Sequence, residues 1–292
     1  MNAIAVSKRP GRRISVFNVI NYSILTLLAL SMILPFWHIL MYSLSPGAND
    51  AKVQFLFVPI GFGFDGYLNA FSTNSLLQSY MNTITLTVVG TLSSVLLTAM
   101  AAYALSKKSL YGYRFFTLFL FITMVFGGGL VPTLYVVKTL KLSNSMFALF
   151  VPRLISGFYV FLMRNFFISN PASLEESAKL DGANDFTIFW RIVVPISRPL
   201  IATMVLFHAV EYWNTWFDGL IYLSDKSKYP LMLLLRNIMY DQDIGIFNPS
   251  ALPIAKTVQN ACVIISTVPI LLVYPFLQKY FVKGIMIGAI KS

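Results

Sequence analysis

Four polar side chains share one expected helix face inside an otherwise apolar stretch: His208, Glu211, Thr215 and Asp218. Their steps of three, four and three residues place them within an arc of about 80° on an α-helix. An ionisable group costs at least ~2.5 kcal/mol at the centre of a bilayer unless it faces a helix bundle or water. The stripe therefore predicts either the wall of a translocation path or a helix contact held by a His208–Glu211 pair.

Arg153 and Asn214 are two further polar candidates for a translocation path. Arg153 follows Pro152, about 10 Å into an apolar stretch at 1.5 Å per residue. There it could contact an acidic sugar, pair with a helix end or extend to the interface. Asn214 lies between Trp213 and Trp216, whose rings suit either a sugar face or the aromatic belt of a membrane protein. The chain has two histidines and one cysteine, so we predict no catalytic residue and no metal site.

The composition is that of an all-α integral membrane protein. Of 292 residues, 57% are hydrophobic and only 11% are charged, against roughly 25% charged in soluble domains. The mean hydropathy is +0.71. The single cysteine, Cys262, excludes a disulfide framework. A net charge of +11 could suggest a protein that binds nucleic acid. In a membrane protein, however, Lys and Arg collect in cytoplasmic segments, so we attribute the charge to topology and expect no nucleic-acid partner.

Six apolar stretches are long enough to cross a bilayer as helices, which takes about 20 residues each. The expected spans are 16–44, 81–105, 115–138, 146–168, 200–223 and 258–278. With residues 1–15 in the cytoplasm, fourteen Lys and Arg side chains fall on the cytoplasmic side and seven in the outer loops. This bias predicts a multi-pass domain over residues 16–278, a cytoplasmic tail over 279–292, and both termini in the cytoplasm.

The segment 170–199 is charged and lies between two of the expected spans, on the cytoplasmic side. Pro171 suits the first turn of a helix over 171–180, and Asn170 could cap it. Gly182 can adopt the positive φ of a turn. Asn184 or Asp185 can cap a second helix that ends near Pro195 and Pro199. The sequence predicts a helix-turn-helix elbow that presents charged and aromatic side chains to a partner protein.

Three short runs in the elbow form a pattern with fixed spacing: Glu176-Ser177-Ala178, Asp181-Gly182-Ala183 and Ile192-Val193-Val194-Pro195. This pattern resembles the coupling loop of ATP-binding cassette importer permeases, with Ser177 and Val194 as its departures. The stretches "WNTWFD", "PLMLLLR" and "QKYFVKGIMIGAIKS" extend the resemblance over nearly the whole chain. They are similar to the carbohydrate group, namely the maltose-type second permease and its oligosaccharide relatives, permeases for alginate-type sugars included.

The resemblance implies a subunit that forms half of a sugar pore in a bacterial inner membrane. The elbow would sit in a cleft of a cytosolic ATPase dimer, whose closure on ATP drives the membrane helices. Glu176 would meet a basic group of the ATPase, and Gly182 would supply the turn. The coupling residues implied are Glu175, Glu176, Ser177, Ala178, Asp181, Gly182, Ala183 and Pro195. The tail after Gln278 would also reach the ATPase.

The resemblance also implies a second, related permease, an extracytoplasmic solute-binding protein and membrane lipid as partners. The chain contains no phosphate-binding G-x-x-x-x-G-K-[ST] loop, so ATP and Mg would be used by the ATPase and no cofactor would be bound here. The residues leave a rival open, an ion-coupled secondary transporter with His208 and Glu211 as a proton relay. An ordinary amphipathic loop is the alternative for the elbow.

Overall fold

Helices make up all the regular structure in the described residues of the computed structural model, which are 16–46, 55–72, 74–247 and 255–289. The all-α prediction is therefore confirmed for these residues. In chain order the elements are α1 (Val16–Ser43), α2 (Asp65–Ser72), α3 (Asn74–Ser106), α4 (Tyr113–Val125), α5 (Leu130–Thr139), α6 (Phe147–Phe150), the 3₁₀ turn η2 (Val151–Arg153), α7 (Gly157–Ile168), α8 (Ala172–Leu180), α9 (Asp185–Ile188), the π-helix η3 (Phe189–Val193), α10 (Val194–Ile196), α11 (Arg198–Trp213), α12 (Phe217–Tyr222), the 3₁₀ turn η4 (Lys226–Lys228), α13 (Leu231–Phe247) and α14 (Lys256–Ala289).

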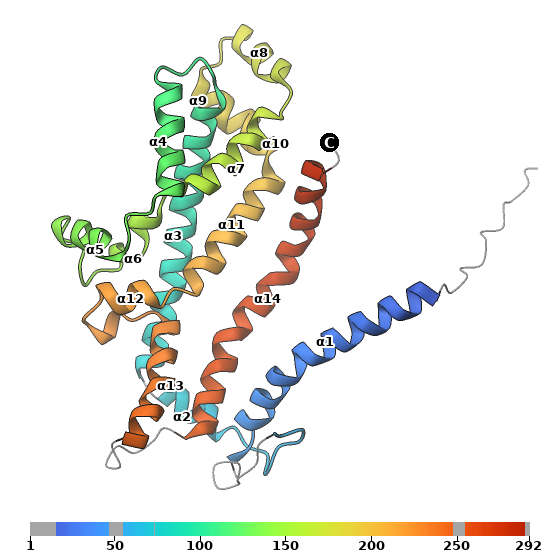
Figure 1. The fold of residues 1–292 in the computed structure, drawn as a ribbon, viewed down its shortest axis with the longest axis vertical. Helices are drawn as coiled ribbons and strands as arrows, with labels where there is room; N and C mark the ends of the chain where they lie inside the picture. The colour runs from blue at the N-terminus through green and yellow to red at the C-terminus, as the bar shows by residue number, and fades with distance from the viewer. Residues whose placement is uncertain (1–15, 47–54, 73, 248–254, 290–292) are drawn as a thin grey trace, which may run out of the picture.

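Helix α3 is the centre of the bundle and packs against α7 and α11 (Figure 1). Its 33 residues include no charged residue and no proline, so nothing interrupts the helix. Small residues let its neighbours come close. A Cβ at Gly90 would lie 2.9 Å from the Tyr212 ring of α11, and Ser94 Oγ is 2.8 Å from the Tyr212 hydroxyl.

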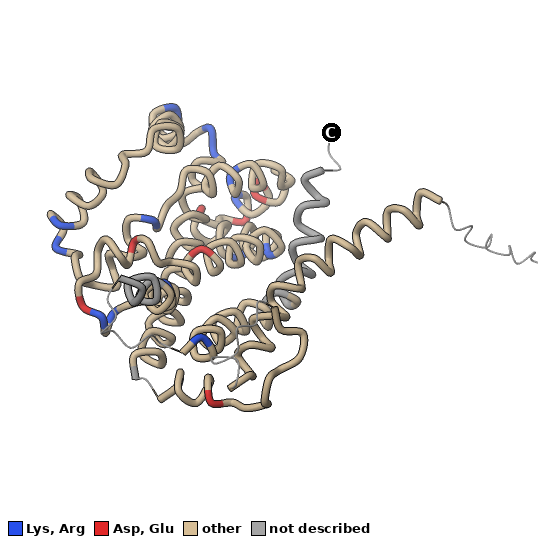
Figure 2. The backbone as a smooth tube through the Cα atoms, turned by 60° about the horizontal axis from the view of Figure 1, so that its bottom comes forward, with Lys and Arg blue, Asp and Glu red and all other residues tan. Residues whose placement is uncertain are grey.

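Helix α1 stands apart from this bundle and packs mainly along α14 (Figure 1). It contains no Lys, Arg, Asp or Glu, which is visible in Figure 2 as an uninterrupted tan helix. Most of its large apolar side chains are exposed, and only its last three residues are buried. Such a surface suits lipid or another apolar chain far better than water.

The expected spans correspond to helices, but several of them are broken. By length and composition, α1 and residues Ser75–Ser106 of α3 could each cross a membrane, and up to five crossings result if three bent helix pairs are counted as one each. The pair formed by α4 and α5 bends by 119° after Gly127, Gly128 and Gly129. Residues 115–138 are thus not one straight span, because Gly129 adopts a φ of +79° that a helix does not use.

Two other expected spans also differ from straight helices. In 146–168 the chain bends by 50° between η2 and α7, next to Pro152. In 200–223 helix α11 ends at Trp213 and α12 begins at Phe217. By contrast, α14 covers 258–278 and continues as a helix into the expected tail as far as Ala289. The six-span count remains a prediction, and residues 1–15 and 290–292 lie outside the described residues.

Candidate functional site

The elbow predicted over 170–199 forms the outermost part of one end of the bundle (Figure 1). Its first helix, α8, begins at Ala172 with Pro171 as its N-cap residue, and no side chain caps it. The expected Asn170 cap is therefore wrong, because the extended backbone at Pro171 moves Asn170 one position too far from the helix. Gly182 has a φ of +80°, as predicted, and its N–H donates to the Lys179 carbonyl at 3.0 Å.

The second half of the elbow begins with the predicted cap. Asn184 Oδ1 accepts a hydrogen bond from the Thr187 N–H at 2.8 Å. Helix α9 then widens into the π-helix η3 before α10. Pro195 lacks the N–H that would continue α-helical bonding to the carbonyl four residues earlier, and η3 ends two residues before it, at Val193. The chain turns by 84° between α9–α10 and α11.

The predicted coupling residues divide into an outer and an inner set. Ala178 and Ala183 pack against a buried cluster shared by the elbow, α3, α7 and α11. Pro195 is half-buried in α10, and Glu175 is half-buried beside Lys107, with which it forms an ion pair. The exposed set is Glu176, Ser177, Asp181 and Gly182. Close to the exposed set, Leu180 and Phe186 are 89% and 64% exposed, so the outer surface carries apolar side chains as well as charge.

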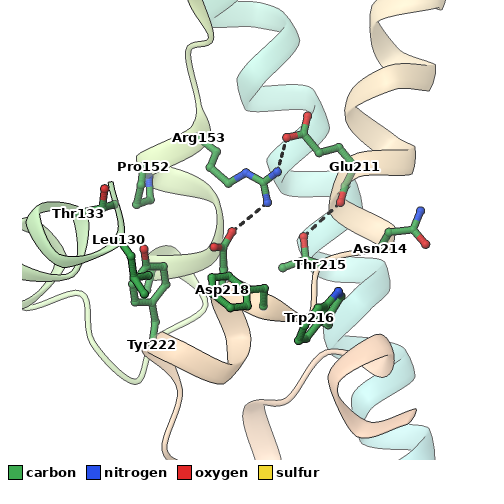
Figure 3. A pocket seen from close by; sticks show the side chains of 12 residues that line it. Leu130, Thr133, Pro152, Arg153, Glu211, Asn214, Thr215, Trp216, Asp218 and Tyr222 are labelled. Carbon is green, nitrogen blue, oxygen red and sulfur yellow. Dashed lines mark hydrogen bonds and ion pairs between the residues drawn. The ribbon is translucent and has the colours of Figure 1, made fainter. Parts of the chain in front are cut away.

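A cavity of about 570 Å³ lies farther along the bundle, between α5, η2, the end of α11 and α12 (Figure 3). It brings together five of the six residues predicted for a translocation path: Arg153, Glu211, Asn214, Thr215 and Asp218. Aromatic rings of Trp216, Phe217 and Tyr222 complete the wall. The cavity therefore offers carboxylates, an amide, a hydroxyl and flat apolar faces to one ligand.

Arg153 forms ion pairs with both carboxylates on the polar side of this cavity. Its Nη1 donates to Asp218 Oδ2 at 2.9 Å, and its Nη2 forms an ion pair with Glu211 (Figure 3). The helical arc expected for Glu211 and Asp218 does not exist, because α11 ends at Trp213. Arg153 joins the two acids instead, and this arginine–dicarboxylate cluster has a formal charge of −1. Arg153 thus pairs with acids across the bundle rather than extending to the interface.

His208 is separate from the cavity. Its side chain is buried, and its ring lies 4.6 Å from the Tyr159 ring and stacks on Tyr212. The alternative in which His208 pairs with Glu211 is wrong for the described residues, because Glu211 binds Arg153 and the Nε2 of His208 has no partner there. The sequence could not reveal the Arg153 contacts, since they join residues 58 and 65 positions apart.

A second cavity of about 550 Å³ adjoins the first and shares Pro152, Arg153 and Glu211 with it. Its remaining wall comes from the end of α4 and the start of α7, including Thr123 and Tyr159. The Arg153–Glu211 pair thus lines two neighbouring cavities. The sequence did not predict this second cavity. It lies beside the 119° bend after α4 and the 50° bend before α7, and the only sequence signals for these bends are the glycines 127–129 and Pro152.

An ordered loop lies beyond the cavity, beside Asn82 near the start of α3. Asn144 Oδ1 accepts from the Asp225 N–H at 3.0 Å, and Lys228 Nζ donates to the Asn144 carbonyl at 2.9 Å. Hydrogen bonds from Ser227 lower the pKa of the Asp225 carboxyl below its ordinary value. These contacts fix residues 224–228, which connect α12 to α13, to the loop before α6.

Comparison with known proteins agrees with this architecture. Residues 14–287 match the family described as "Binding-protein-dependent transport system inner membrane component". The chain is 39% identical over 281 residues to the polygalacturonan/rhamnogalacturonan transport system permease protein YtcP of Bacillus subtilis (strain 168), covering 94% of this chain and 98% of the relative. Protein LplC of the same strain is 40% identical over 281 residues, with 95% of each chain covered.

A solved structure shows the same similarity in three dimensions. It is a chain of a bacterial ABC transporter involved in the import of the acidic polysaccharide alginate. The TM-score is 0.84 at 31% sequence identity, and the match covers 94% of this chain and 100% of that one.

Proposed function

This chain belongs to the family of inner membrane components of binding-protein-dependent transport systems, and on that premise we propose that it forms half of the pore of an ATP-driven oligosaccharide importer. As a permease component it is an integral membrane protein, and ATP is hydrolysed by a separate chain. The observation that carries the proposal is the elbow, whose second half buries Ile188, Phe189 and Val193 in the bundle while its motif residues Glu176, Asp181 and Gly182 face outward.

The proposed arrangement has six spans within residues 16–278, cytoplasmic residues 1–15 and a cytoplasmic tail over 279–292. Figure 1 supports it, because the elbow and the end of α14 lie at the same end of the molecule, opposite α2 and α13. The excess of Lys and Arg expected on the elbow's side supports a cytoplasmic position for that end.

Coupling would work through the elbow as a lever. A dimeric ATPase that uses ATP and Mg would bind the exposed surface around Glu176, Ser177, Asp181, Gly182 and Phe186. Its closure would push α9–α10, whose buried side chains pack on α3, α7 and α11. A second, related permease would complete the pore, and an extracytoplasmic solute-binding protein would deliver the sugar at the opposite end.

The two cavities at Arg153 would form this chain's part of the translocation path. Carboxylates of Glu211 and Asp218 can accept hydrogen bonds from sugar hydroxyls, and the Trp216 ring can stack on a sugar face. YtcP is named for the transport of polygalacturonan and rhamnogalacturonan, and the solved transporter is described as importing the acidic polysaccharide alginate, so an acidic oligosaccharide is the first substrate to test. The proton-relay alternative is not favoured, because Glu211 binds Arg153 rather than His208.

The test is sugar uptake by the whole transporter. This chain is expressed together with its partner subunits, and the purified complex is reconstituted in proteoliposomes. We expect uptake of trigalacturonate to require ATP, to persist after the proton gradient is collapsed, and to be lost in Gly182→Pro, which cannot adopt a φ of +80°. A matched control is Gly128→Ala, whose Cβ meets no atom closer than 3.9 Å. Uptake that follows the proton gradient, or a purified chain without an ATPase, would contradict the proposal.

A further inference from the structure

The two halves of the elbow are attached to the bundle in different ways. In the second half, Ile188, Phe189 and Val193 are almost completely buried in the cluster shared with α3, α7 and α11. The first half, α8, has no buried residue. Its apolar contribution to the bundle is limited to Ala178, which is partly buried. Hydrophobic burial therefore fixes the second half firmly and the first half weakly.

A polar contact attaches α8 to the bundle where hydrophobic burial is small. Glu175 forms an ion pair with Lys107, the residue that directly follows the end of α3. The two side chains are only 17% and 27% exposed, so solvent screens this pair less than a surface pair. The other ion pair of α8, Lys179–Asp185, has a distance of 3.4 Å, and its side chains are 54% and 70% exposed. Moreover, it joins α8 to α9 within the elbow and not to the bundle.

Lys107 is itself held in place by aromatic side chains. Its Nζ lies 4.7 Å from the centroid of the Tyr103 ring, within the range of a cation–π contact. The Tyr103 ring in turn lies 5.3 Å from the ring of Phe189 in η3. Lys107 thus connects α8, the cytoplasmic end of α3 and the buried half of the elbow.

Two adjacent glutamates of α8 have different surroundings. Consecutive residues project about 100° apart on a helix. Glu175 faces Lys107, whereas Glu176 is exposed and has no hydrogen bond or ion pair among the described residues. Glu176 is free to meet another protein, and Glu175 is occupied within this chain.

We propose that Lys107 and Glu175 are a positioning pair that makes α8 move as one body with α3. The proposal rests on the proposed function and changes the role of Glu175, which acts on its own chain rather than on the ATPase. Without the pair, α8 pivots at the Gly182 turn when the ATPase closes. The motion then reaches α3 only through the second half of the elbow, so ATP hydrolysis continues with less transport per ATP.

Hydrogen exchange of the complete transporter tests the pair directly. We expect Lys107→Ala and Glu175→Gln each to raise amide exchange in residues 172–180 by roughly fivefold, as expected for the loss of about one ion pair, with exchange in 185–196 unchanged. The double variant Lys107→Glu/Glu175→Lys restores the ion pair but not the cation–π contact with Tyr103, so exchange in α8 should fall well below that of either single variant. Lys108→Ala is the matched control, because Lys108 is adjacent and exposed.

Coupling is measured on the same variants as trigalacturonate taken up per ATP hydrolysed. The ratio should fall in both single variants, recover in part in the double variant and stay unchanged in Lys108→Ala. Equal exchange in α8 with and without Lys107 would overturn the proposal. So would single variants that lose the ATPase during purification while α8 stays protected, because Glu175 would then bind the ATPase. Absence of ATP-driven uptake in the unmodified transporter would instead contradict the proposed function, and hydrogen exchange would still decide whether the pair holds α8.

Discussion

At the scale of single residues, the most consequential contact is the one between Arg153 and its two acids. Each of the three side chains is between 22% and 36% exposed, so part of their hydration is lost. Removing the arginine alone would leave two like charges facing each other, whereas removing all three charges would leave a neutral polar wall. The structural value of Arg153 thus depends on its acids being present.

The first prediction separates these two situations. Arg153→Ala should destabilise the purified transporter by ~1–3 kcal/mol, between the values typical of exposed and buried pairs. Arg153→Ala combined with Glu211→Gln and Asp218→Asn should recover part of that loss, because no unpaired charge remains. Thermal unfolding in detergent, followed through release of the subunits, checks the order. A triple variant less stable than Arg153→Ala would contradict the ion-pair account.

The second prediction concerns which sugars the cavity accepts. Asp218→Asn changes the formal charge of the arginine–dicarboxylate cluster from −1 to 0, so repulsion of an anionic sugar decreases. We expect uptake of trigalacturonate relative to a neutral trisaccharide to rise by about fivefold, as for ~1 kcal/mol of repulsion removed at a partly solvated site. Competition uptake assays measure the ratio. Asp225→Asn, a change outside the cavity, should leave the ratio unchanged.

At the scale of elements, helix contacts and caps decide how the spans meet. Gly90 of α3 leaves no room for a Cβ beside the Tyr212 ring of α11. On the elbow, Asn184 begins α9 while Asn170 contributes no cap to α8. A substitution at Gly90 therefore tests the contact between α3 and α11, and a substitution at Asn184 tests the start of α9.

The third prediction tests the contact between α3 and α11. Gly90→Ala places a Cβ 2.9 Å from the Tyr212 ring, so the ring has to move and its hydroxyl loses Ser94. We expect a loss of ~1–3 kcal/mol in stability, typical of overpacking. Thermal unfolding of the purified transporter is the measurement. Gly128→Ala serves as the control, and equal stability of the two variants would contradict the packing shown here.

The fourth prediction compares the two asparagines of the elbow. Asn184→Ala removes the hydrogen bond to the Thr187 N–H and should destabilise α9 by ~1 kcal/mol. Hydrogen exchange over residues 185–188 should rise correspondingly. Asn170→Ala should leave exchange in α8 unchanged, because its side chain caps nothing. If both substitutions act alike, the cap assigned to Asn184 is wrong.

Local signals in the sequence predicted local structure well, and distant contacts poorly. The turn at Gly182, the cap at Asn184 and the uninterrupted α3 follow from side chains close in sequence, and all three are present. Hydropathy detects apolar residues but not bends, so 115–138 and 200–223 looked continuous. Polarity identified the cavity residues in the sequence. The ion pairs that join Arg153 to Glu211 and Asp218 could not be predicted, because they depend on how the helices pack.

At the scale of the whole molecule, orientation is the property that the charge distribution predicts. The elbow contacts Lys107 just after the end of α3, whereas Ser227 accepts a hydrogen bond from Asn82 near the start of α3, so the two segments should face opposite sides of the membrane. The chain has a single cysteine, Cys262, which is buried. Engineered cysteines can therefore report their side of the membrane without background.

The fifth prediction uses this property. In a Cys262→Ser background, Ser173→Cys should react with a membrane-impermeant maleimide only in inside-out vesicles, and Ser224→Cys only in intact cells. Both positions are exposed in the structure. Labelling of the two positions from the same side would rule out the proposed topology.

The pairing of α1 with α14 has a consequence for biogenesis. These helices are the first and the last of the chain, so the ribosome releases α1 long before its neighbour exists. Until α14 has been synthesised, most of the apolar surface of α1 must be covered by lipid or by the insertion machinery. A nascent chain stopped before residue 256 would carry every other described helix, yet α1 would keep only the contacts of its last residues, among them those with Leu56 and α2.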